Sequence, residues 1–231
     1  TFGVQLTKLQ FLPDGDLLVV GTGANGETAW QVDAEAGTST AINLAETDTP
    51  TPWTDIAIDP SGRGVLLEPT ISSETGEGVL AIRELDASNA EAISVSEVLQ
   101  TVPADAEVLT SDGTRTVFAW SDTGGTQLSL WSNATASFIS SSDVMGSLTS
   151  ELVAFDDAAG IVAVRTASGG VGVYDTDANF APLHTLSEAS GPVAIDSSRD
   201  LLFSIPSGDT KLQLLNLRDG SMIADMAIDL S

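Results

Sequence analysis

The sequence predicts an all-β fold of about five four-stranded antiparallel units. Three observations lead to this prediction: a repeat of about 40 to 50 residues, strands in which apolar and polar residues alternate, and turns that contain Gly, Asp or Ser. Alternation with a period of two is typical of strands with one buried face. The one short stretch with a helical period is Ser94 to Thr101.

Each repeat begins with an alternating strand, a polar turn and a more continuous apolar strand. The five copies are LQFLPDGDLLVVGT from Leu9, IAIDPSGRGVLLEP from Ile56, EVLTSDGTRTVFAW from Glu107, LVAFDDAAGIVAVR from Leu152 and VAIDSSRDLLFSI from Val193. The turn glycines Gly15, Gly62, Gly113 and Gly160 are spaced 47, 51 and 47 residues apart, and a fifth turn follows near Asp200. This spacing indicates repetition of one supersecondary unit.

A third and a weaker fourth strand complete each unit. Four-stranded meanders that bury both faces against their neighbours are the blades of a β-propeller. We therefore expect a single propeller domain over residues 1–231, closed by the C-terminal strand completing the first blade. The expected blades are 1–45, 46–96, 97–142, 143–187 and 188–231. The chain lacks an initiator Met and is expected to be part of a longer protein.

The repeats resemble the WD40 family. The resemblance is clearest in residues 184–223, in the third-strand segments VGVYDTDAN and LSLWSNATA, and in the turns FLPDG and IDPSG. The Trp-Asp pair of the family survives as Tyr174-Asp175 or Trp131-Ser132, and its Gly-His pair is absent because His184 is the only histidine. The resemblance implies a WD40-like propeller in which a loop face binds partners.

The charge balance restricts the possible partners. There are 33 Asp and Glu residues against 8 Lys and Arg, and the formal net charge is −25. Such a surface repels phosphate backbones and anionic lipid heads, so neither nucleic acid nor membrane insertion is expected. A basic protein or peptide, or other domains of the same polypeptide, would be complementary. The compartment is left open, with an extracytoplasmic domain of a bacterial protein as one possibility.

The motifs that suggest chemistry have simpler interpretations. Gly21, Gly23 and Gly26 have the G-x-G-x-x-G spacing of a dinucleotide site, but a strand follows them where that site needs a helix, so we interpret them as part of a hairpin loop. The stretch from Asp175 to Asn179 alternates oxygen side chains as a calcium loop does, yet Phe180 replaces the required Gly. We expect a solvated turn, no cofactor and no metal site, and the alternative is a loosely held calcium ion on the acidic surface.

No catalytic residue is predicted. The chain has no Cys and one His, which excludes thiolate chemistry and leaves too few ligands for zinc. No pair of carboxylates stands out as a glycosidase site. A propeller hydrolase or lyase with a site at the central channel remains an alternative.

The candidate binding residues follow from the WD40 resemblance. In that family, the loops that join outer to inner strands share one face with the loops between second and third strands. Here that face would hold the partner-binding residues Trp53, Asp55, Glu74, Glu77, Trp120 and Asp122. Trp53 lies in a Pro-rich connection, where it is either a plug over the joint between blades or an exposed anchor.

The predicted function is that of a non-enzymatic protein-interaction or sensing module. Its loop face would bind a protein or peptide. The alternative within binding proteins is a propeller that stacks a carbohydrate or another small ligand on Trp53 and Trp120.

Overall fold

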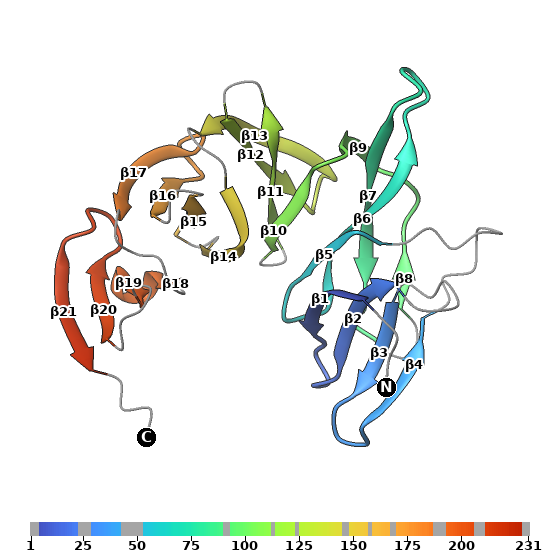
Figure 1. The fold of residues 1–231 in the computed structure, drawn as a ribbon, viewed down its shortest axis with the longest axis horizontal. Coiled ribbons are helices and arrows are strands. Elements are labelled where there is room, and N and C mark those ends of the chain that lie inside the picture. The colour runs from blue at the N-terminus through green and yellow to red at the C-terminus, as the bar shows by residue number, and fades with distance from the viewer. Residues whose placement is uncertain are drawn as a thin grey trace. The chain divides into compact units, whose positions relative to one another are not determined.

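The structure is a computed structural model, and it confirms an all-β chain of five antiparallel sheets (Figure 1). It describes residues 5–22, 29–42, 53–89, 93–111, 114–122, 125–144, 148–156, 159–166, 170–186, 193–205 and 211–227. Among these residues, the helical content is one 3₁₀ turn, Ser197–Arg199. No described helix is long and apolar enough to cross a membrane.

The first four strands follow one another in chain order within each sheet, and in sheet 2 a fifth strand pairs with the third. Sheet 1 contains β1 (Gln5–Phe11), β2 (Leu17–Thr22), β3 (Ala29–Asp33) and β4 (Thr38–Ala41). Sheet 2 contains β5 (Asp55–Ile58), β6 (Arg63–Ile71), β7 (Gly78–Asp86), β8 (Ser94–Val95) and β9 (Gln100–Pro103). Sheet 3 contains β10 (Glu107–Ser111), β11 (Arg115–Asp122), β12 (Gly125–Ser132) and β13 (Ser137–Val144).

The last two sheets have the same order. Sheet 4 contains β14 (Leu148–Asp156), β15 (Ile161–Thr166), β16 (Val171–Asp175) and β17 (Ala181–Leu186). Sheet 5 contains β18 (Val193–Asp196), β19 (Leu201–Ser204), β20 (Lys211–Asn216) and β21 (Met222–Ala227).

The chain divides into two compact units, which we describe separately. Unit 1 is residues 1–116 and 131–137, and unit 2 is residues 117–130 and 138–231. In unit 1, β5 lies beside both β1 and β10, and in unit 2, β14 lies beside β18. First strands of successive sheets are therefore neighbours within each unit.

The turn between the first and second strands makes the same contact in four sheets. A carbonyl of this turn accepts a hydrogen bond from the backbone N–H just beyond the third strand. The pairs are Gly62 with Ala87 (2.7 Å), Thr114 with Asn133 (3.0 Å), Gly160 with Thr176 (2.7 Å) and Asp200 with Leu217 (2.9 Å). Gly62, Gly160 and Asp200 all have the left-handed φ that this turn needs. The repeat seen in the sequence is thus a repeat of tertiary contacts.

A second recurring feature ends the third strand. The side-chain oxygen of its last residue accepts hydrogen bonds from backbone N–H groups two or three residues later, which closes an Asx or Ser turn into the fourth strand. This residue is Asp33, Asp86, Ser132, Asp175 or Asn216 in sheets 1 to 5. The aspartate position of the repeat therefore has a local role in the turn.

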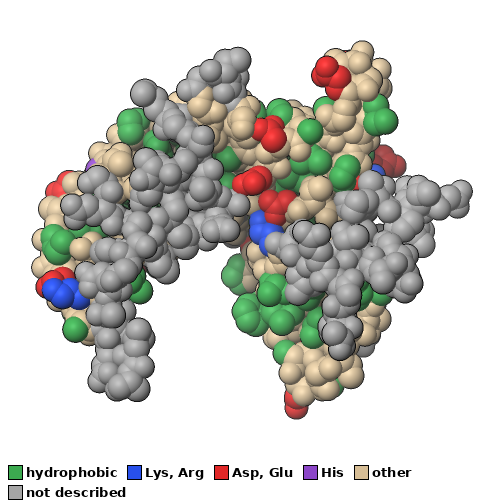
Figure 2. Space-filling view, viewed as in Figure 1, with side chains coloured by type: hydrophobic (Ala, Val, Ile, Leu, Met, Phe, Trp, Pro, Cys, Tyr) green, Lys and Arg blue, Asp and Glu red, His purple; other side chains and the backbone are tan. Residues whose placement is uncertain are grey.

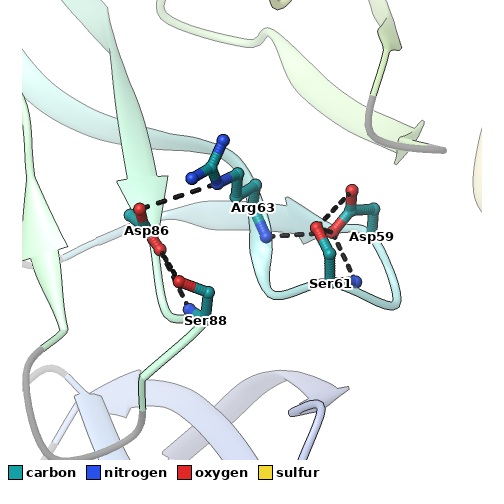
Figure 3. Close-up of polar contacts among 5 residues, drawn as sticks. All are labelled: Asp59, Ser61, Arg63, Asp86 and Ser88. Atoms are coloured by element: carbon teal, nitrogen blue, oxygen red, sulfur yellow. Dashed lines mark hydrogen bonds and ion pairs between the residues drawn. The ribbon is translucent and has the colours of Figure 1, made fainter.

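The contacts of the Asp86 carboxylate predict how the stability of the fold changes with pH (Figure 3). The Ser88 hydroxyl donates to Asp86 at 2.5 Å and its N–H at 3.0 Å, and Arg63 lies 3.7 Å away. These contacts, the Ser88 hydroxyl first, lower the pKa of Asp86. A lowered pKa in the folded state stabilises the fold above the ordinary carboxyl pKa, and this stabilisation is lost as the pH falls through the lowered value.

We expect Ser88→Ala to raise the pKa of Asp86 toward its ordinary value. The variant should be less stable than wild type at neutral pH, and the difference should disappear in acid once Asp86 is protonated in both proteins. NMR titration of the carboxyl carbons measures the pKa directly. The matched control is Ser198→Ala, because Ser198 makes the equivalent bond to Asp196 at 2.6 Å and should leave Asp86 unchanged.

The core lies between stacked sheets. In unit 1, a buried cluster joins sheets 1 and 2, and in unit 2, a second cluster joins sheets 4 and 5. The first includes Leu18, Val20, Ile56, Leu66 and Leu85. Because both faces of sheet 2 lie against neighbours, its strands β6 and β7 contain near-continuous apolar runs.

Three expectations need correction. The C-terminal strand does not complete the first sheet: β21 pairs with β20, and sheet 1 contains its own fourth strand. A short turn brings β21 onto the edge of β20, so the local pairing has a low loop-closure cost. Ser94 to Thr101 is not helical but holds β8 and the start of β9. Since β9 pairs with β7, sheet 2 also extends beyond the expected boundary at residue 96.

Candidate interaction surface

The six predicted residues fall into two groups. Trp53, Asp55, Glu74 and Glu77 lie in unit 1, on or beside sheet 2, whereas Trp120 and Asp122 lie in unit 2, at the end of β11. The sequence does not separate these groups, because the predicted face rests on loop order alone.

Trp53 is a plug and not an exposed anchor. Its side chain is only 6% exposed and belongs to the core cluster between sheets 1 and 2. Leu18 and Val20 from β2 and Ile56 from β5 belong to the same cluster. The structure thus places the indole at the joint between two sheets.

Asp55 joins three neighbouring first strands. One carboxylate oxygen lies 2.5 Å from the Lys8 ammonium, and the other accepts the Val108 backbone N–H at 2.8 Å. Lys8 also donates to the Val108 carbonyl at 2.8 Å. We call Lys8, Asp55 and Val108 the inner-strand clamp. The side chains of Lys8 and Asp55 are 23% and 14% accessible, so both are largely withdrawn from solvent.

The sequence does not indicate Lys8 as the partner of Asp55. Lys8 is one of only two lysines in the chain and lies on the first strand. These two facts are the signal in the sequence that could have identified it as the partner of Asp55. The register of β1 shifts between Leu6 and Lys8, which is a β-bulge. Bulges change the direction of a side chain and are frequent near sites that need an exact orientation.

Glu74 and Glu77 are exposed at the tip of the β6–β7 hairpin. We call residues 71–79 the hairpin tip. The Ser72 hydroxyl accepts the N–H groups of Glu74 and Thr75, and the Ser72 N–H donates to the Glu77 carbonyl at 2.9 Å. These bonds fix the turn and leave both carboxylates in solvent.

The hairpin tip also exposes a large apolar side chain. Ile71 is 72% exposed at the end of β6, next to the acidic turn. In Figure 1 the hairpin extends past the rest of sheet 2, and Figure 2 shows acidic and hydrophobic side chains together at its end. Ile71 was not predicted, because its strand pattern looks like that of a buried position.

The base of the hairpin is rigid. Arg83 donates to Glu68 at 2.6 Å and to the Ser96 carbonyl at 2.8 Å, which ties β6, β7 and the connection between β8 and β9 together. In addition, β9 pairs with residues 79–82 of β7. The hairpin tip is therefore held on a three-stranded support, which lowers the entropy lost when a partner binds.

Trp120 packs within unit 2. It is half-buried, and its ring lies edge-on to Phe138 with 5.8 Å between centroids. Phe138 makes a second edge contact with Phe118 at 5.5 Å. Asp122 is the last residue of β11, and its side chain lies outside the described part.

The remaining motifs are part of the framework where they can be described. Asp175 caps its own turn through two backbone N–H groups, and Phe180, at the position that a calcium loop gives to Gly, is buried. The His184 Nε2 lies 2.8 Å from the Leu217 carbonyl. Within the described residues, no three His, Asp or Glu side chains group as a metal ion would require. Gly23 and Gly26 lie outside the described residues.

Comparison with known proteins supports the fold class. No family model matches the chain, and no curated protein matches its sequence. Among solved structures, it is similar to a propeller chain of a nidogen/laminin complex, with a TM-score of 0.57, 9% identity, and coverage of 96% of this chain and 80% of that one. The fold is therefore of the β-propeller type.

Proposed function

We propose that this chain is a non-enzymatic protein-interaction module, a WD40-like propeller that presents the hairpin tip to a protein or peptide partner. The observation that supports this most strongly is Ile71, a large apolar side chain 72% exposed beside two free carboxylates on a braced hairpin. Interfaces commonly combine an apolar anchor with a polar rim.

The charges point to a basic partner. Glu74 and Glu77 extend into solvent from a chain of net charge −25. Such a field attracts cationic surfaces from a distance and speeds encounter, while Ile71 would supply contact area after docking. Support from the similar structure is limited to its being a propeller in a complex between two proteins.

Stacking of a carbohydrate has less support than binding of a protein. That alternative relied on Trp53 and Trp120, and the burial of Trp53 removes one of the two platforms. Trp120 has one ring edge against Phe138.

We expect Glu74→Lys/Glu77→Lys to weaken binding of basic ligands by about tenfold or more, because two attractive charges become repulsive. Peptides selected on the wild type from a library of varied charge provide the probe, and calorimetry provides the affinity. Stability should change little, because both side chains are exposed.

The matched control is Glu35→Lys/Glu97→Lys. It makes the same change in net charge at exposed positions away from the hairpin tip. If the control weakens binding as much as the hairpin variant, the net charge of the chain attracts the basic peptide, and the hairpin tip is not the binding site.

A further inference from the structure

The outer half of the β6–β7 hairpin has one apolar face. The register of β6 with β7 is unbroken as far as the pair of Ile71 with Gly78, and Pro69 pairs with Leu80 on the same face, because alternate residues of a strand share a face. Val102 of β9 pairs with Leu80 and extends this face. The opposite face includes the polar side chains Glu68, Thr70, Arg83 and Thr101.

This apolar face runs from the core to the hairpin tip. Leu80 and Val102 are each 5% exposed, Pro69 is half-buried, and Ile71 is 72% exposed. The inner part of the face is therefore packed within the protein. Its outer part, at the pair of Ile71 with Gly78, presents apolar surface at the tip.

Gly78 lacks the structural reasons that explain other glycines. A glycine within a strand costs conformational entropy and packs no side chain. Gly76, in the same hairpin, has the left-handed φ of 72° that its turn requires. Gly172 in β16 lies so close to Tyr174 that a Cβ would be 2.6 Å from the hydroxyl oxygen. At Gly78, φ is not left-handed, and a Cβ would meet no atom of the described residues within 4 Å.

The missing side chain leaves an open space on the apolar face. We call the space over the Gly78 backbone, bordered by Ile71 on the neighbouring strand, the Gly78 notch. Side chains of directly paired residues lie about 4.5–5.5 Å apart at their Cβ atoms, so the Ile71 side chain forms one wall of the notch. A glycine in a strand often marks a place where a ligand closely approaches the backbone.

The shape and charge of the notch select one kind of ligand. A flat aromatic ring can cover a glycine of a sheet, and it pairs well with a β-branched neighbour such as Ile71. Glu74 and Glu77 are the only charged residues of the hairpin tip, and Glu77 directly precedes Gly78. Both carboxylates are exposed, so a cation beside the ring would meet negative charge.

We propose that the Gly78 notch binds an aromatic side chain of a basic peptide, whose flanking Lys or Arg residues face Glu74 and Glu77. This proposal rests on the proposed function and assigns the chemistry of the ligand. Charge brings the peptide to the hairpin tip, and the ring in the notch separates the correct ligand from other polycations.

Calorimetry with the peptides Lys-Lys-Phe-Lys-Lys and Lys-Lys-Ala-Lys-Lys tests the notch. We expect the Phe peptide to bind the wild-type chain roughly tenfold more tightly than the Ala peptide. In Gly78→Val the new side chain occupies the notch, so the two affinities should agree within about twofold. The matched control is Thr70→Val, which places the same side chain on the opposite face and should keep the preference for Phe.

Thermal unfolding of Gly78→Val shows whether the notch is open in the isolated chain. Valine favours a strand and meets open space there, so the Tm should stay the same or rise. A lower Tm would mean that another segment of the chain fills the notch, and would overturn the proposal.

The outcomes separate the notch from the proposed function. Equal binding of the two peptides to the wild type, or a preference for Phe that survives in Gly78→Val, would overturn the notch. The proposed function would still hold if Glu74→Lys/Glu77→Lys weakened binding of both peptides. If neither peptide bound the wild type, both proposals would be wrong.

Discussion

Trp53→Ala is expected to lower the free energy of unfolding by about 3–5 kcal/mol, the range for removing a large aromatic side chain from a packed core. The indole is almost fully buried between sheets 1 and 2, in contact with a cluster that includes Leu18, Val20 and Ile56. Loss of the indole would leave a cavity between two sheets. The backbones of two different sheets cannot easily move together to close that cavity. Urea unfolding followed by circular dichroism measures the change.

The segments that Trp53→Ala destabilises are as informative as the change in the free energy of unfolding. Hydrogen exchange in Trp53→Ala should rise in β2 and β5, which border the cavity. Trp120→Ala is the comparison, because that ring is half-buried and should cost less. A loss below about 1 kcal/mol for Trp53→Ala would mean that the ring is exposed, and would restore it as a candidate binding anchor.

Asp55→Ala is expected to cost about 2–3 kcal/mol. The substitution leaves the Lys8 ammonium and the Val108 N–H without their carboxylate partner in a largely covered site. This estimate lies below the range for fully buried pairs because both side chains keep some access to solvent. Denaturant titration gives the value.

Two further variants distinguish the stabilising effect of the inner-strand clamp from the effect of simply removing a charge. Lys8→Met/Asp55→Leu removes both charges and should recover part of the stability, since no ion is left unpaired. Asp225→Ala breaks the exposed pair with Lys211 and should cost less than about 1 kcal/mol. Equal effects for Asp55→Ala and Asp225→Ala would show that the inner-strand clamp does not brace the strands.

The repeat could be predicted because its causes are local. Alternation sets the strands, and Gly62 or Asp86 sets a turn through bonds within a few residues. These features recur in the sequence, so the number of sheets and the order of their strands follow from it. The type of residue that ends the third strand also follows, since the turn needs only an oxygen side chain, whether from Asp, Asn or Ser.

The candidate site depends on contacts between residues that are far apart in the sequence. Lys8 is 47 residues from Asp55, and Val108 is 53 residues from it, so no local pattern shows that the carboxylate is engaged. The burial of Trp53 likewise depends on sheet 1. Glu74 and Glu77 are exposed because a hairpin turn exposes its tip whatever its neighbours do, and their role in binding stays a prediction. Closure by the C-terminal strand was wrong because strand pairing favours the nearest edge.

These observations separate framework from surface. Trp53 and the inner-strand clamp hold sheets together, whereas Ile71, Glu74 and Glu77 remain available on a hairpin fixed by Arg83. Variants of the first group should reduce stability, and variants of the second group should reduce binding with little loss of stability.

Hydrogen exchange with and without a bound basic peptide tests the proposed interaction surface most directly. Peptides selected on the wild-type chain serve as the ligand, and exchange is followed by mass spectrometry. We expect added protection centred on residues 71–79, with a smaller effect in the supporting strand β9. Protection confined to other segments, with residues 71–79 unchanged, would contradict the account.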